Sequence, residues 1–455
     1  MKEQVHQWVL AHREELTADI GRLVRIPSVA VDGDESAPYG KPCLEALNAF
    51  LRMSEGYGFA TAAWNHQIGR VTLREAGEEL ALWGHLDVVP VGEGWDYPPF
   101  EATLREGVLI GRGAQDNKGQ AVACLYVMRC LRELGVPLKR TLRLYVGTDE
   151  ERGMQDLKNY LLCHQPPAFS IVADSNFPIC FGEKGIVTVR FAADWPENAV
   201  IRSVRAGSAP NVVPDYAEAL LRLPTGEERA VTASGRAGHT AFPQNSVNAI
   251  AALTGALGRQ PVTAEEKRLL RFCDRVNADC YGTALGLAYE DEISGRMTLV
   301  GSMLQVEDGR MTLTCNLRCS LTQDMDALLA KLRAVAAENA LRLEADQVSP
   351  PHSFPREHAI VQKLTRVYEE HTGKKRAPFV LPGGTYSRLL PASISFGMGY
   401  GEDHEEWMRP YRHLFREGHG GAHGPDECTV VDGLLKAIEI YAAGLVAIDD
   451  VPLAP

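Results

Sequence analysis

His85 and Asp87 stand two residues apart, directly after the apolar run Leu80–Trp83 and a break at Gly84. The run is typical of a buried strand, so an imidazole that can bind a metal is expected at a strand end. Because residues i and i+2 of an extended segment point the same way, Asp87 could hold the second ring nitrogen of His85. A strand ending in a purely structural His–Asp pair fits the motif equally well.

Three further carboxylate motifs also follow apolar runs. Asp116 comes after the predicted strand 108–110 and just before a predicted helix, Glu150 and Glu151 follow the strand 141–146, and Asp174 follows the strand 169–173. Open α/β sheets build their sites at the carboxyl ends of strands, so these side chains are expected to meet. Clustered carboxylates destabilise a fold unless they are protonated, solvated or bound to a cation, and zinc accepts both imidazole nitrogen and carboxylate oxygen. The pattern therefore indicates two zinc ions that share a carboxylate.

The first 183 residues must position this set. Alternating helix and strand patterns predict an α/β domain, with a largely parallel sheet and helices on both faces. The expected elements are helices over 1–25, 44–53 and a stretch that begins after Asp116, and strands over 71–73, 80–83, 108–110, 141–146 and 169–173.

The pattern changes after residue 183. Residues 184–352 read as an inserted α+β lid domain, with helices after Pro214 and over 246–257 and 325–336, and a hairpin of strands 299–306 and 311–317. Residues 353–455 read as the return of the first domain, with a helix over 358–371, a turn at Gly383-Gly384, a strand over 394–396 and a helix over 430–448.

Composition excludes several classes of function. A net charge of -12 over 455 residues argues against nucleic acid as a partner. No apolar stretch reaches the roughly 20 residues that cross a bilayer, and the amphipathic start of the chain does not resemble a signal peptide. The ten cysteines form no repeating framework and are expected to be reduced. We therefore expect a soluble cytoplasmic protein that binds neither membrane nor nucleic acid.

Several sequence blocks together carry a family resemblance. Gly84-His-Leu-Asp-Val-Val-Pro90, Arg112-Gly-Ala-Gln-Asp-Asn-Lys-Gly119, Thr148-Asp-Glu-Glu151 and Gly421-Ala-His-Gly-Pro-Asp-Glu427 resemble the signature blocks of the aminoacylase/carboxypeptidase G superfamily of co-catalytic zinc metallopeptidases. Their order and spacing match over nearly the whole chain. Ala173–Pro178, Asn211–Pro214 and Gly383–Arg388 are most similar to its dipeptidase branch, typified by peptidase V.

The resemblance implies a ligand set for two zinc ions. His85 and Asp174 would bind one ion, Glu151 and His423 the other, and Asp116 would bridge both, while Asp87 orients His85. Manganese or cobalt would also fit these ligands. His404, His413 and His419 lie close to His423 in sequence, but its glycine-rich frame and the following Pro425-Asp426-Glu427 favour His423. Asn117 stands where the family usually has an acidic or small residue, after a cis peptide at the bridging aspartate.

The implied chemistry is hydrolysis by a metal-activated water. Glu150 fits the proton-transfer role because a turn after Gly147 could place one glutamate on the metal and the other on the water. In the resemblance His239 stabilises the oxyanion. The same resemblance gives the substrate-binding residues as Asn211, Arg318, Gly383 and Gly384. Each of these also has a structural interpretation as a strand-end or turn residue.

We predict a metal-dependent dipeptidase that hydrolyses short peptides. The alternative with the same dizinc site is an N-acyl amino acid deacylase, distinguished by whether a free N-terminal amine is required. A non-catalytic metal- or peptide-binding relative need not retain Glu150, which is present here. The insert 184–352 exceeds the single small lid of dimeric relatives, so we expect a monomer in which His239 acts on its own chain.

Overall fold

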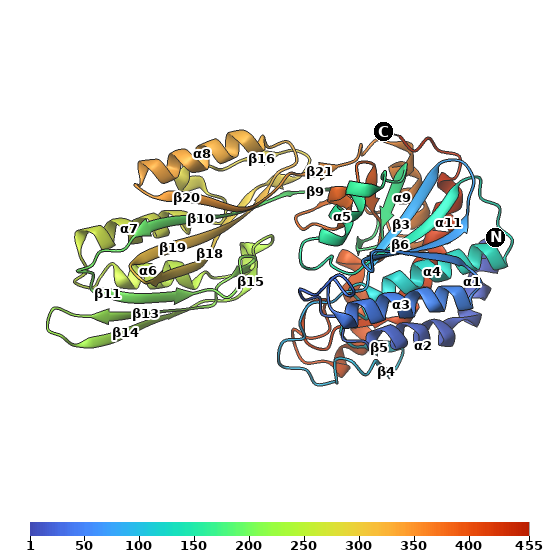
Figure 1. Cartoon of the computed structure of the whole chain (residues 1–455), viewed down its shortest axis with the longest axis horizontal. Helices are drawn as coiled ribbons and strands as arrows, with labels where there is room; N and C mark the ends of the chain where they lie inside the picture. Colours follow the sequence, from blue (N-terminus) through green and yellow to red (C-terminus); the bar gives the residue numbers. More distant parts are fainter. Residues whose placement is uncertain (455) are drawn as a thin grey trace. The chain divides into compact units, whose positions relative to one another are not determined.

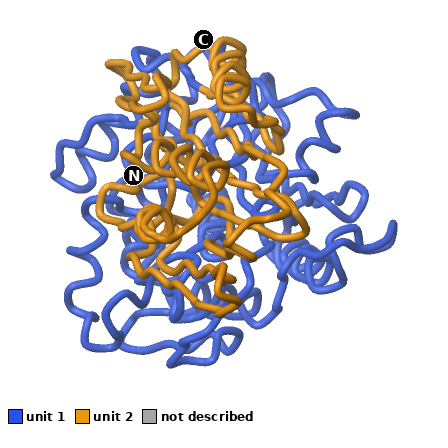
Figure 2. The backbone as a smooth tube through the Cα atoms, turned by 90° about the vertical axis from the view of Figure 1, so that its left-hand side faces the viewer, with its two compact units in different colours: residues 1–181, 353–379, 385–455 blue, residues 182–352, 380–384 orange. Residues whose placement is uncertain are grey.

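The computed structural model describes residues 1–454, and the chain divides into two compact units. The first comprises residues 1–181, 353–379 and 385–455, and the second comprises residues 182–352 and 380–384 (Figure 2). Residues 380–384 belong to the second unit, because Leu381 and Pro382 accept hydrogen bonds from Lys184 and Arg318 of that unit. Each unit is described by itself.

The first unit is built on a mixed sheet, in which β3 and β6 are labelled in Figure 1. The strand order is β1-β2-β6-β3-β7-β23. β3 runs parallel to β6 and β7, and β23 runs parallel to β7, whereas β1 and β2 are antiparallel additions at one edge. The strands are β1 (Ala60–Trp64), β2 (Ile68–Arg74), β3 (Glu79–His85), β6 (Thr141–Gly147), β7 (Phe169–Val172) and β23 (Ser393–Ser395).

Helices cover both faces of this sheet. On one face Trp83 of β3 stacks on Tyr145 of β6 and packs against Tyr160 of α5. On the other face a Cβ at Gly84 would lie 3.4 Å from the Cβ of Ala121 in α4, so the missing side chain lets that helix lie close to the strand. The α/β fold class predicted from the sequence is confirmed. The helices of this unit are α1 (Lys2–Ala11), α2 (Arg13–Val24), α3 (Lys41–Gly56), α4 (Lys118–Glu133), α5 (Gln155–Cys163), α9 (Ala359–Thr372), α10 (His404–Met408) and α11 (Val431–Ile448).

The prediction of one helix over residues 1–25 is wrong at His12. This residue has φ -104° and ψ 9°, and it separates α1 from α2. Its ring stacks on Trp8 with centroids 3.9 Å apart, and Nδ1 lies 2.7 Å from the Trp8 carbonyl oxygen. The amphipathic pattern continues on both sides of His12 and so does not reveal the break.

The second unit is a seven-stranded sheet with the order β14-β13-β11-β18-β19-β10-β20. Alternate residues of its strands form a core with helices α6, α7 and α8. The predicted hairpin is present as β18 and β19, which pair from Glu307 and Arg310. The elements are β10 (Gly185–Asp194), β11 (Ile201–Ala206), β13 (Tyr216–Arg222), β14 (Glu228–Ser234), β18 (Thr298–Glu307), β19 (Arg310–Cys319), β20 (Arg342–Ser349), α6 (Ala249–Leu257), α7 (Ala264–Val276) and α8 (Met325–Glu338).

The helix predicted after Pro214 is wrong, because this segment is the strand β13. Ala217, Ala219 and Leu221 are buried and the residues between them are exposed, which is the period of two of a half-buried strand. β13 gains pairing partners on both sides, from β11 and β14. These partners outweigh the helical preference of its alanines and leucines.

Shorter strands complete the fold. In the first unit β5 lies between β4 and β25, and β24 pairs with β8; in the second unit β12 pairs with β15, and β16 with β17. Their bounds are β4 (Thr103–Arg105), β5 (Val108–Ile110), β8 (Ser175–Asn176), β12 (Val212–Val213), β15 (Gly238–His239), β16 (Glu290–Asp291), β17 (Gly295–Arg296), β24 (Met398–Gly399) and β25 (Cys428–Val430). β9 (Cys180–Glu183), β21 (His352–Ser353) and β22 (Phe379–Leu381) lie where the chain passes between units.

Two expectations from composition bear on the described residues. All ten cysteines lie within residues 1–454, and none forms a disulfide. Over the same range, every helix is too short or too polar to span a bilayer.

Candidate metal centre

His85 occupies the last position of β3 and is 1% exposed. Its Nε2 lies 3.0 Å from Oδ1 of Asp116 and 3.7 Å from Oδ2 of Asp174. Its Nδ1 lies 3.0 Å from the backbone carbonyl oxygen of Asp87 and 3.3 Å from that residue's carboxylate. Nε2 therefore faces the acidic residues, and Asp87 orients the ring through Nδ1.

Asp116 lies between two imidazoles. Its Oδ1 faces Nε2 of His85 at 3.0 Å, and its Oδ2 faces Nε2 of His423 at 3.1 Å. His423 Nε2 is also 3.1 Å from Oε1 of Glu151. Because the two oxygens of one carboxylate point to different ligand sets, Asp116 has the disposition of a bridging ligand.

The structure distinguishes His423 from its neighbours. His413 pairs with Glu106 at 3.2 Å, and His419 Nδ1 lies 2.6 Å from Oδ2 of Asp426. Only His423, among the histidines of residues 404–423, lies beside Asp116 and Glu151. It has a positive φ of 61°, so the glycine-rich turn around it sets an unusual backbone direction.

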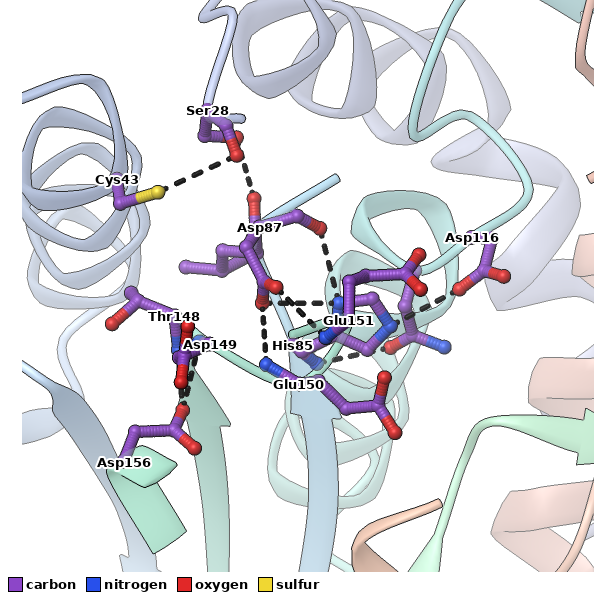
Figure 3. A network of polar contacts seen from close by, with 12 residues as sticks. Ser28, Cys43, His85, Asp87, Asp116, Thr148, Asp149, Glu150, Glu151 and Asp156 are labelled. Carbon is purple, nitrogen blue, oxygen red and sulfur yellow. Dashed lines mark hydrogen bonds and ion pairs between the residues drawn. The ribbon is translucent and has the colours of Figure 1, made fainter. Parts of the chain in front are cut away.

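The side chains of Glu150 and Glu151, which lie on the loop after β6, contact different residues of the site. Glu151 reaches His423 and Asp116, whereas Glu150 lies with His85 and Asp174. The Asp87 carboxylate accepts the N–H groups of Glu150 at 3.1 Å and Glu151 at 3.0 Å, so it holds this loop as well as His85 (Figure 3). The turn lets both glutamates face the site. On a strand, adjacent side chains point to opposite faces of the sheet, so one of the two would point away from it.

A second buried carboxylate holds the first half of the same loop. Asp156 Oδ2 accepts the N–H groups of Thr148 at 2.7 Å and Asp149 at 3.0 Å (Figure 3). It also accepts the Tyr386 hydroxyl at 2.5 Å. Asp156 and Asp87 thus hold four consecutive N–H groups, those of residues 148–151. Asp156 could not be recognised from the sequence, because an aspartate in the first turn of a helix carries no local sign of this role.

Asn117 takes up the position where an acidic or small residue was expected. The Asp116–Asn117 peptide is cis. The Asn117 side chain donates to Oδ1 of Asp174 at 3.0 Å and to the Ala173 carbonyl at 2.8 Å, and its Oδ1 accepts the His85 N–H at 3.2 Å. Asn117 therefore joins the segment of Asp116 to the ends of β3 and β7.

The electrostatics of the cluster require a proton or a cation. Burial raises the pKa of Glu150 well above its usual value and, with the nearby charge of Asp116, raises the pKa of Asp174 to about 7. Burial and Asp116 also raise the pKa of Glu151. Oε1 of Glu150 is buried without a hydrogen-bond partner, which is costly for a carboxylate in the interior.

The donor set fits divalent metal ions. Two overlapping groups, His85 with Glu150 and Asp174 and His85 with Asp116 and Glu151, each bring their ligand atoms within 4.8 Å of one another. Nitrogen and carboxylate oxygen donors of this kind suit zinc, and they also suit manganese or cobalt. Bound cations would balance the carboxylates that burial otherwise disfavours.

The predicted substrate-binding residues lie in the second unit. Asn211 and His239 are exposed on two paired segments, in which Val212 is the partner of His239. Arg318, 5% exposed, donates through Nε to Oδ1 of Asn316 at 3.0 Å and through Nη1 to the carbonyl of Pro382 at 3.1 Å.

A polar chain connects these residues within the second unit. Oδ1 of Asn316 also accepts the hydroxyl of Thr240, the residue after His239, at 2.7 Å. Asn316 thus joins Arg318 to the His239 segment, and Pro382 joins Arg318 to Gly383 and Gly384. The sequence analysis gave Asn316 no role, although it lies at i-2 of Arg318 on the same strand and points to the same side.

Comparison with known protein families gives a match over most of the chain. The model of peptidase family M20/M25/M40 matches residues 81–446, which include every residue of the metal centre. The chain belongs to this family and is a hydrolase of the peptidase class.

Individual proteins that the chain resembles include dipeptidases. The chain is 30% identical to the putative dipeptidase YtjP of Bacillus subtilis, over 96% of this chain and 98% of the relative. It is 28% identical to the Beta-Ala-Xaa dipeptidase of Lactobacillus delbrueckii subsp. lactis, over 96% of each. Among solved structures, human carnosine dipeptidase 1 matches the fold with a TM-score of 0.61, at 14% identity and over 99% of each chain.

Proposed function

We propose that the protein is a metal-dependent dipeptidase with two zinc ions per chain. His85 and Asp174 would hold one ion, Glu151 and His423 the other, and Asp116 both. The observation that carries this proposal is the placement of the two Asp116 oxygens, which face His85 and His423 respectively. Two relatives that match almost the whole chain are named as dipeptidases, which supports dipeptides as the substrate class.

The proposed mechanism assigns proton transfer to Glu150. When bound, the two ions supply an acidified water and polarise the scissile carbonyl. Glu150 accepts the proton of the attacking water and returns it to the leaving amine. Its burial supports this role, because burial raises the pKa of this carboxyl above its usual value and so makes the carboxylate a stronger proton acceptor. Asp87 and Asp156 keep its loop in place.

The second unit would bind the substrate. Arg318 would bind a carboxylate of the substrate with its planar guanidinium, which the contacts to Asn316 and Pro382 orient. Gly383 and Gly384 would offer backbone N–H groups to the terminal carboxylate, and Asn211 would bind the peptide. His239 would donate to the oxyanion of the tetrahedral intermediate. The reduced, mostly buried cysteines favour a cytoplasmic location.

Metal removal is the direct test. Dialysis against a chelator is expected to abolish hydrolysis of a dipeptide panel, and zinc, manganese or cobalt should restore it, because the ligand set accepts all three. The panel should pair each dipeptide with its N-acetylated form. Cleavage of the free-amine peptides alone supports a dipeptidase, whereas preference for the acetylated forms indicates the deacylase. Hydrolysis that survives complete metal removal contradicts both.

Arg318→Lys is expected to lower kcat/KM for dipeptides by about tenfold or more, mainly through KM. A lysine keeps the charge but loses the planar fork, and hydrogen bonds to charged groups contribute roughly 1.5–3 kcal/mol. Steady-state kinetics measure the effect. Arg310→Lys, on the same strand and exposed beside Glu344, is the matched control. Equal kinetics in the two variants would remove Arg318 from the site.

We further propose that the enzyme is a monomer and that His239 serves its own chain. Mixtures of His239→Ala and Glu150→Ala, prepared under conditions that allow subunit exchange, should stay inactive, because neither chain has a complete site to offer. Light scattering should give the mass of one chain. Recovery of activity on mixing would show sites shared between subunits and exclude the monomer.

A further inference from the structure

Glu427 lies outside the proposed ligand set, yet its side chain is fully buried beside it. Oε1 accepts three backbone N–H groups of one loop, from Gly113 at 3.0 Å, Gln115 at 3.0 Å and Asp116 at 2.9 Å. Its backbone carbonyl accepts the N–H of Gly111 at 2.8 Å. One residue thus accepts hydrogen bonds from four backbone N–H groups of the segment 111–116.

The charge of Glu427 is balanced within the protein. Nη1 of Arg112, which is 1% exposed, donates to Oε2 of Glu427 at 2.5 Å. The same guanidinium bonds the carbonyls of Pro90 and Val91 at 3.3 Å and lies over the ring of Trp95. A buried ion pair of this kind is weak evidence for stability, because both charges lose their hydration. Its geometry therefore calls for another explanation.

The position of Glu427 in the chain explains why this buried ion pair is present. Glu427 follows His423 by four residues, and the intervening turn is anchored separately. Oδ1 of Asp426 accepts the N–H groups of Asp96 at 2.9 Å and Tyr97 at 3.0 Å, and the N–H of Gly420 bonds the carbonyl of Pro425 at 3.0 Å. Glu427 consequently joins the hydrogen-bonded turn that carries His423 to the loop that carries Asp116.

We infer that Glu427, held by Arg112, is a positioning residue that sets the direction of the Asp116 carboxylate relative to His423. It touches neither substrate nor metal and acts through the Asp116 backbone. Because the bridging oxygens must face two ions at once, a small rotation of this loop would weaken both sites. Partners of this kind typically change metal affinity about 10- to 100-fold. The inference rests on the proposed metal centre.

The test measures zinc binding to the metal-free full-length protein by competition with a chromophoric chelator. Glu427→Gln keeps the size and one carbonyl oxygen but places an amide opposite Arg112 or opposite the three N–H groups. It is expected to bind zinc at least tenfold more weakly. Its kcat is expected to fall by a larger factor than its KM changes. Asp19→Asn is the control, since Asp19 is also buried and bonds Arg22 at 2.7 Å and Tyr126 at 2.9 Å away from the metal ligands. It should lose thermal stability and retain zinc affinity.

The outcomes separate this inference from the proposed function. If wild-type protein binds zinc and hydrolyses dipeptides while Glu427→Gln matches it in zinc affinity, the positioning role is overturned and the function stands. If wild-type protein binds no zinc, the metal centre itself is wrong. Should Glu427→Gln fail to fold, Arg112→Lys carries the test: a zinc affinity equal to that of wild type would overturn the inference, and a weaker one would support it.

Discussion

Glu150→Gln is expected to retain both metal ions and to lose kcat by about 10²- to 10⁴-fold, the usual contribution of a general base. Glutamine keeps the shape of the side chain and leaves the backbone bond to Asp87 intact, but it cannot accept a proton. Metal analysis of the purified variant and steady-state kinetics on a dipeptide check the two halves of this prediction.

The neighbouring glutamate provides the matched control. Glu151→Gln removes a carboxylate that lies 3.1 Å from His423, so it is expected to lose metal rather than proton transfer alone. Full metal content in Glu151→Gln together with metal loss in Glu150→Gln would reverse the roles of the two residues.

Asp116→Asn is expected to bind fewer than two ions and to lose activity at least as far as Glu150→Gln. An amide has one oxygen and one N–H₂ group, so it cannot present an acceptor to His85's ion and another to His423's ion. Metal titration by calorimetry should therefore show a reduced stoichiometry, which a variant that only slows turnover would not show.

Asp149→Asn is the control for a buried carboxyl in the same region. Burial, helped by the charges of Asp156 and Asp87, raises the pKa of Asp149 to about 7, so this group is already partly protonated at neutral pH. Its replacement by an amide should keep two ions. If Asp116→Asn also bound two ions with unchanged affinity, Asp116 would not be the bridging ligand.

Much of this protein was determined by local sequence. Apolar runs ended by glycine or a turn located the strands β3, β5, β6 and β7, and their ends carry His85, Asp116, Glu150 and Asp174. This worked because the burial of a strand and the polarity of the segment that follows it are both visible within a few consecutive residues, in the parallel strands β3, β6 and β7 and in the antiparallel strand β5 alike. The same local signals predicted the β18–β19 hairpin and the α/β class.

Local signals failed where a distant partner decided the outcome. The segment after Pro214 is a strand because β11 and β14 flank it. This pairing does not appear in the periodicity of the segment itself. Tertiary context overrides propensity in such cases.

Only the tertiary structure decided how the site residues are aimed. Glu427 and Gly113 are 314 positions apart, and Asp156 and Tyr386 are 230 positions apart, so no spacing rule connects them. The sequence supplied the residue types that can bind a metal ion. The fold determined that one oxygen of Asp116 faces His85 and the other His423, because hydrogen-bond directions depend on backbone segments that meet only after folding.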